Sequence, residues 1–177
     1  EINVLLNFTQ SVDDVNYKVF KANKTEISQL LTDKNYVQFD NYLRLMKIVT
    51  SATDEKTKTI DDAKVLKEGE GLLPKEDLQK SLNIYKLNYY ISHENYQGYE
   101  KTALEYYKNT DEFNASELLA AAGVFNDHIS NPKSLQMAAR WAEKVVMSQE
   151  NFDSTSILAS LYDKLGKKDE ARSEERR

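Results

Sequence analysis

The sequence predicts an all-α protein in which antiparallel helix pairs stack on one another. Its 177 residues include only 5 glycines and 2 prolines, whereas an all-β sandwich needs many more turn residues. Apolar residues recur at helical spacing along most of the chain. After residue 71 the expected connectors are about two to six residues long, so consecutive helices become antiparallel neighbours.

Composition excludes several classes of function. The chain has no cysteine, which excludes disulfides, a thiol nucleophile and thiolate-bound metals. Its net charge of −5 argues against a nucleic-acid partner. No apolar run reaches the roughly 18 residues of a membrane-spanning helix, and no phosphate-binding loop is present. We therefore expect no cofactor and no bound metal.

The first 70 residues are expected to form an N-terminal helical region. Short helices are expected near residues 12–20 and 25–31, while residues 2–8 are the one stretch that could be extended. The clearest element is a long amphipathic helix. Its apolar side chains share one face: Tyr36, Phe39, Leu43, Met46 and Val49. Residues 51–59 are polar and predict a loop, followed by a helix from Ile60.

Gly69 and Gly71 mark the clearest hinge, and residues 71–177 are expected to form one continuous array of helix pairs. Pro74 fits the first turn of the next helix. Asn114 and Glu117 have the spacing of a capping box, in which each side chain bonds the other's backbone. The later helices are expected at about 95–108, 114–129, 133–149 and 153–165, the last of them capped by Asp153.

The final expected helix pair carries the most specific motif. The segment Leu158-Ala159-x-x-Tyr162-x-x-Leu165-Gly166-x-x-x-x-Ala171 resembles a tetratricopeptide repeat. Small residues allow two helices to cross closely, and the glycine permits the left-handed conformation of a tight turn. The preceding unit is similar but looser, with Ala121-Ala122-x-x-Phe125 and Ala138-x-x-x-Ala142-x-x-Val145. It departs from the family in its longer turn, and Thr155 stands where a tryptophan is typical.

This resemblance implies a right-handed superhelix that binds a protein or peptide and has no catalytic residues of its own. In this family the inner groove is lined by the first helix of each pair. Carried over to this chain, the groove residues are Asn126, Asp127, Asp153, Ser156, Ser160 and Asp163. The surface is polar and mildly acidic. It lacks the lysine and arginine clamp with which some family members hold a peptide's terminal carboxylate.

The stretch from Ala138 to Ala171 also resembles the helical tail of certain bacterial thioredoxin-fold proteins. That resemblance implies a periplasmic or cell-envelope location, and a cytoplasmic location is the alternative. It also implies that any redox chemistry lies outside these residues. Because the sequence opens in the hydrophobic stretch 1–8, we expect it to be part of a longer protein.

Tyrosines are concentrated in one region, with seven of the eleven between Tyr85 and Tyr107. Tyr90 and Tyr107 fall off the expected buried stripes. We include both as candidate groove residues, because tyrosine is enriched at interfaces. The alternative interpretation is that these rings pack between helices.

Two other functions remain open. His93 and His128 show no metal-binding spacing and are interpreted as helix-end residues. They could nevertheless serve a small hydrolytic enzyme domain with a pocket between residues 1–68 and 74–177. A third hypothesis is a homo-oligomer that forms through apolar edges.

Overall fold

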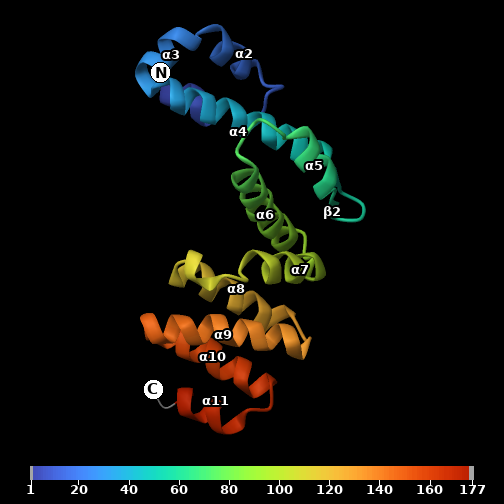
Figure 1. Cartoon of the computed structure of the whole chain (residues 1–177), viewed down its shortest axis with the longest axis vertical. Coiled ribbons are helices and arrows are strands. Elements are labelled where there is room, and N and C mark those ends of the chain that lie inside the picture. The colour runs from blue at the N-terminus through green and yellow to red at the C-terminus, as the bar shows by residue number, and fades with distance from the viewer. Residues whose placement is uncertain (1, 176–177) are drawn as a thin grey trace. The chain divides into compact units, whose positions relative to one another are not determined.

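The computed structural model describes residues 2–175 and divides into two compact units, Glu1–Tyr85 and Lys86–Arg177 (Figure 1). Helices dominate both units, so the protein is mostly α, and a two-stranded hairpin departs from the all-α prediction. Among the described residues, no helix combines the length and the apolar character needed to cross a membrane.

The first unit consists of three short helices and one long helix, followed by a small hairpin and a further short helix. Its elements are α1 (Ile2–Phe8), α2 (Val15–Ala22), α3 (Lys24–Leu31), α4 (Asp33–Ser51), β1 (Thr53–Asp54), β2 (Thr59–Ile60) and α5 (Asp62–Glu68). Helix α6 (Lys75–Ser92) crosses the boundary between the units. The core around α2, α3 and α4 is aromatic: the rings of Phe20 and Tyr36 stack with centroids 4.3 Å apart, beside the buried Ile27.

Helix α1 corrects the expectation that residues 2–8 could be extended. Leu5 and Leu6 of this helix pack against the aromatic core of the first unit. The hydroxyl of Thr9 then donates to the carbonyl of Leu5 at 2.6 Å, just past the end of the helix. Tertiary packing, rather than local propensity, therefore decides this element.

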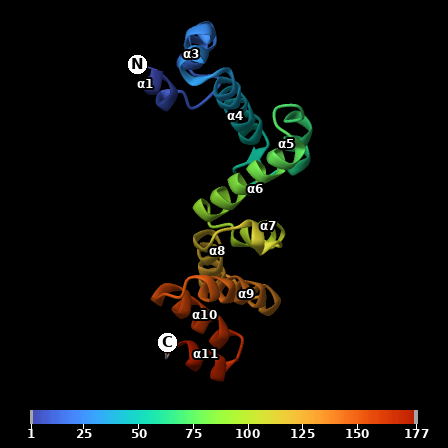
Figure 2. The same ribbon diagram turned by 60° about the vertical axis from the view of Figure 1, so that its left-hand side comes forward.

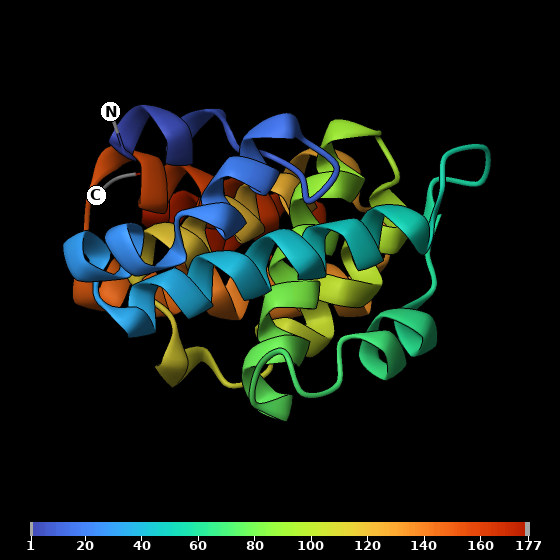
Figure 3. The same ribbon diagram turned by 90° about the horizontal axis from the view of Figure 1, so that it is seen from above.

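The β1–β2 hairpin corrects the expectation of a polar loop followed by a helix from Ile60. Thr53 pairs with Ile60, and the amide of Asp61 donates to the carbonyl of Ala52 at 2.9 Å. Because Ile60 is held in this pairing, α5 begins two residues later, at Asp62. The turn of the hairpin projects beyond the ends of α4 and α5 (Figure 3).

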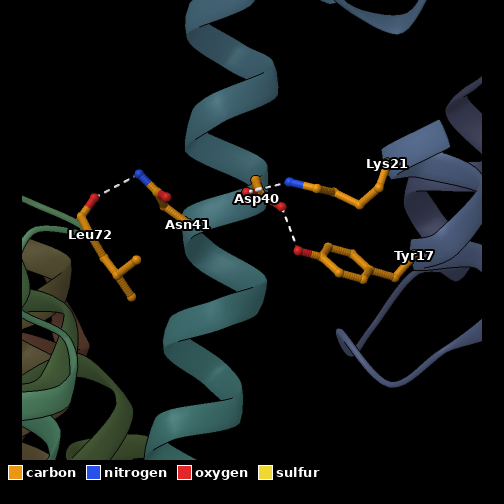
Figure 4. Close-up of polar contacts among 5 residues, drawn as sticks. All are labelled: Tyr17, Lys21, Asp40, Asn41 and Leu72. Carbon is orange, nitrogen blue, oxygen red and sulfur yellow. Dashed lines mark hydrogen bonds and ion pairs between the residues drawn. The ribbon is translucent and has the colours of Figure 1, made fainter. Parts of the chain in front are cut away.

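A buried carboxylate joins α2 to α4 (Figure 4). The side chain of Asp40 is 12% exposed, and it accepts hydrogen bonds from the Tyr17 hydroxyl at 2.7 Å and the Lys21 ammonium at 3.0 Å. Burial opposes ionisation of Asp40, but these donors, with the charges of Lys21 and Arg44, outweigh burial and lower its pKa. Burial and the bond to Asp40 raise the pKa of Tyr17 to about 12.

The turn between α5 and α6 is anchored to the other side of α4. The side-chain amide of Asn41 donates to the carbonyl of Leu72 at 2.7 Å (Figure 4). A Cβ added at Gly69 would lie 2.8 Å from the carbonyl oxygen of Val65, and Gly71 has a φ of +80°. This turn therefore needs a residue without a Cβ at position 69 and one that adopts a positive φ at position 71, and glycine satisfies both requirements. The turn lies inside the first unit.

The second unit is a run of helices in which each packs on the next in sequence. After α7 (Tyr96–Tyr106) and a short 3-10 turn (Thr110–Glu112) come α8 (Ala115–His128), α9 (Pro132–Ser148), α10 (Phe152–Lys164) and α11 (Lys168–Glu175). The contacts of α8 with α9, of α9 with α10 and of α10 with α11 form adjacent antiparallel pairs (Figures 1 and 2).

The core of the second unit surrounds Trp141 on α9, which is 0% exposed. Its ring lies 5.0 Å from that of Phe125 and 5.5 Å from that of Tyr107, measured between centroids. Five alanines of the predicted repeat motifs are buried on these helices: Ala121, Ala122, Ala138, Ala142 and Ala159. Small side chains at buried positions are what close packing of neighbouring helices requires.

Helix ends in the second unit follow local sequence signals. Asn114 and Glu117 form the predicted capping box at the start of α8. Gly166 has a φ of +75°, and the amide of Lys167 reaches back to the carbonyl of Tyr162 at 2.9 Å. This pattern confirms the predicted left-handed turn after α10.

Alanine substitutions at Gly166 and at Gly123 should change the free energy of unfolding in opposite directions. A Cβ added at Gly166 would meet nothing within 4 Å, so Gly166→Ala tests the left-handed backbone alone. We expect it to lower the free energy of unfolding by about 1 kcal/mol. Gly123 lies within α8, and its added Cβ would make an ordinary 3.7 Å contact with Ile157. Gly123→Ala should therefore raise stability by up to about 1 kcal/mol.

Urea unfolding followed by tryptophan fluorescence measures both variants. Trp141 is the single tryptophan of the sequence and is buried in the second unit, so its emission reports that unit. If Gly166→Ala raised the free energy of unfolding, or if both variants lowered it equally, the left-handed turn assigned to Gly166 would be contradicted.

Asp40→Asn should lower the free energy of unfolding of the first unit by about 1 kcal/mol near neutral pH. Folding lowers the pKa of Asp40. The ionised Asp40 therefore makes its full contribution to the free energy of unfolding at any pH above about 3.9, the ordinary pKa of an aspartate. It is lost as the pH falls through the folded pKa, so the difference between the wild type and Asp40→Asn should vanish in acid. Urea unfolding followed by circular dichroism at pH 7 and pH 2.5 measures this.

The control is Asp13→Asn. Asp13 pairs with Lys47 at 2.7 Å, but its side chain is 69% exposed, so its removal should change stability little at either pH. An Asp40→Asn deficit that persists unchanged in acid would refute the ionic role of Asp40.

Candidate functional site

Two shallow hollows in the second unit adjoin along α10, and we call them together the α10 groove. The first, of about 430 Å³, has an apolar floor between α8 and α10. Its floor consists of Leu119, Ala120, Gly123 and Ile157, and its polar lining of Ser116, Asp153 and Ser156. Because Ser156 also lines the second hollow, the two form a continuous surface.

The second hollow, of about 420 Å³, follows α10 toward α11. Its lining combines hydroxyls, carboxylates and an aromatic ring: Phe152, Thr155, Ser156, Ala159, Ser160, Asp163 and Glu174. Among the described residues, 2–175, no lysine or arginine lines either hollow. The groove is therefore a polar and acidic surface over an apolar floor.

Helical spacing explains why the polar residues of α10 gather on one side. Asp153, Ser156, Ser160 and Asp163 recur every three to four residues and so share a stripe. The buried stripe of the same helix carries Leu158 and Leu161. The four α10 residues predicted from the sequence thus lie together along the groove.

The sequence predicts that Asp153 caps α10, and this prediction is wrong. Asp153 instead stands in the first turn of the helix. The N-cap is Asn151, whose side-chain carbonyl accepts the amide of Ser154 at 3.0 Å. The hydroxyl of Ser154 accepts the amide of Asn151 at 3.1 Å, which completes a reciprocal cap. Because Asn151 takes the capping role, the Asp153 carboxylate is left exposed at the groove.

Asn126 joins α8 to α10 instead of lining the groove. Its side-chain carbonyl accepts the Ser160 hydroxyl at 2.8 Å, and its backbone carbonyl accepts the Lys164 ammonium. Asp127 is exposed and accepts the side-chain amide of Asn126 at 3.1 Å. These ties at the ends of both helices, and the shared first hollow near their starts, show that α8 and α10 run side by side in the same direction.

Tyr90 and Tyr107 lie in the core of the second unit and line neither hollow. Their exposed fractions are 5% and 8%. The ring of Tyr90 packs against Gly98, and that of Tyr107 lies near Trp141. Burial favours the neutral phenol and raises the pKa of Tyr107 to about 12. The candidate site therefore excludes both tyrosines, and the alternative interpretation of rings packed between helices describes them.

The histidines stack on tyrosines near the ends of helices. The ring of His128 lies 3.8 Å from that of Tyr96, and the ring of His93 lies 4.0 Å from that of Tyr89. Across the part of the chain that the structure describes, no group of three histidine, aspartate or glutamate residues is placed to hold a metal ion. The groove offers hydroxyls, carboxylates and apolar surface for binding.

The sequence analysis did not predict several groove residues, above all Ser116, Ala120 and Gly123 on α8. A signal for them exists, because they precede Asn126 and Asp127 at steps of three to four residues. Phe152 was also missed, since a helix expected to start at Asp153 excludes it. Comparison with known proteins adds no further guide: no family model, curated protein or solved structure matches this chain.

Proposed function

We propose that the α10 groove is a docking surface for a protein or peptide, and that this chain is a non-catalytic helical-repeat module. The observation that carries the proposal is the apolar floor between α8 and α10, bordered by the exposed Ser116, Asp153 and Ser156. Interfaces commonly combine an apolar centre with a polar rim.

The tetratricopeptide-like interpretation supports the same function. Ala159 and Ala171 are buried, as the close crossings of that repeat require, and Gly166 forms its left-handed turn. In such an array the first helices of successive pairs form the binding face, and here α8 and α10 hold those positions. We accordingly propose that the pairs continue the geometry of a right-handed superhelix.

The location of the module is part of the proposal. The resemblance of the stretch from Ala138 to Ala171 to the tails of thioredoxin-fold proteins supports a place in the bacterial cell envelope. In that setting the helices would contribute partner docking, while redox chemistry would belong to another domain.

Filling the first hollow should weaken docking. Ala120 is exposed and lies on the floor of that hollow, so Ala120→Trp occupies the space without disturbing the core. Random dodecapeptides displayed on phage and selected on the wild type should include sequences that bind Ala120→Trp at least about tenfold more weakly, a loss of about 1.4 kcal/mol.

The matched control is Gln136→Trp, because Gln136 is exposed on α9 and lines neither hollow. Selected peptides should bind this variant as they bind the wild type. A selection whose peptides all bind Ala120→Trp normally would refute the proposed docking surface.

A further inference from the structure

We infer that the α10 groove selects an extended basic peptide with two cationic side chains four residues apart. The inference rests on the proposed docking function and adds the charge and spacing of the partner. Four observations carry it: the charge of the lining, an exposed aromatic ring, the apolar floor, and the placement of two carboxylates on α10.

The charged residues that the structure places in the lining of the groove are acidic. They are Asp153, Asp163 and Glu174, and no lysine or arginine between residues 2 and 175 joins them. Lys164, the cation next to Asp163, is bound to the carbonyl of Asn126. Asp153 and Asp163 are exposed and make no ion pair among the described residues. A cationic partner would complement this surface, whereas an acidic one would be repelled.

An exposed ring supports the same partner independently of charge. Phe152 is 83% exposed and lines the same hollow as Asp163 and Glu174. A lysine or arginine side chain gains from an aromatic face as well as from a carboxylate. An aromatic ring beside carboxylates is therefore suited to a cationic side chain with an apolar stem.

The floor between the carboxylates suits a small aliphatic residue. Ala120, Gly123 and Ile157 offer apolar surface, and an aliphatic side chain such as valine would bury part of its own apolar surface against them. The groove thus favours the order cationic, aliphatic, cationic along one side of a peptide.

The two exposed aspartates set the spacing. Asp153 and Asp163 stand near opposite ends of α10, so about 15 Å of helical rise separates them. An extended peptide advances about 3.3 Å per residue, and alternate side chains share a face. Side chains four residues apart lie about 13 Å apart on one face, which matches better than about 7 Å for two residues or about 20 Å for six.

Three fluorescein-labelled nonapeptides test the inference by fluorescence anisotropy at low salt. The spaced peptide has lysine at its third and seventh positions, valine at its fifth and serine elsewhere. The adjacent peptide has the same composition with its lysines side by side, and the acidic peptide has glutamate in place of lysine. We expect the spaced peptide to bind about two- to fivefold more tightly than the adjacent one, as one further exposed ion pair allows. The acidic peptide should not bind.

Charge variants locate the contacts. Asp153→Asn and Asp163→Asn should each weaken the spaced peptide about two- to fivefold. The matched control is Asp169→Asn, because Asp169 also stands in the first turn of its helix, is 98% exposed and lines neither hollow. This variant should bind as the wild type does. Retained fluorescence of Trp141 verifies that each variant is folded.

The outcomes separate the inference from the function on which it rests. No binding of the spaced peptide, or equal binding of all three peptides, overturns the inference. So does a lack of effect from both aspartate variants. In each case peptides selected by display that are blocked by Ala120→Trp would leave the docking function standing, whereas an absence of such peptides counts against that function itself.

Discussion

Packing of α8, α9 and α10 around Trp141 is the constraint on which the second unit depends. Buried alanines on these helices leave room for the indole of Trp141, which lies near the rings of Phe125 and Tyr107. Because each helix buries one apolar stripe in this way, the opposite stripe is left polar. The α10 groove lies on that remaining surface, so its existence follows from the packing behind it.

Hydrogen bonds between α8 and α10 hold the two helices beside one another along the groove. Asn126 accepts from both Ser160 and Lys164, which occupies the polar groups at one end of the two helices. Toward the other end, Asn151 and Ser154 form the reciprocal cap, so the Asp153 carboxylate is not used as the cap. The groove thus keeps exposed carboxylates, while Lys164 is engaged in holding the two helices together.

In the first unit, the helices are held together by a buried polar contact as well as by apolar packing. Its short helices α2 and α3 bury few large residues, and the Phe20 and Tyr36 stack supplies most of their aromatic core. Asp40 then connects α2 to α4 through Tyr17 and Lys21 (Figure 4). A carboxylate with two donors is stable there because its hydrogen bonds offset the cost of burial.

Local sequence determined the helical class, the capping box at Asn114, the left-handed turn at Gly166 and the polar stripe of α10, because each depends on neighbours within a few residues. Tertiary structure alone decided that residues 2–8 form a helix, that Tyr90 and Tyr107 are buried, and that Asn126 ties two helices. Periodicity shows which side of a helix is apolar, but it does not show which other segment covers that side. Burial, and with it the lining of a groove, is settled only when segments distant in the sequence meet.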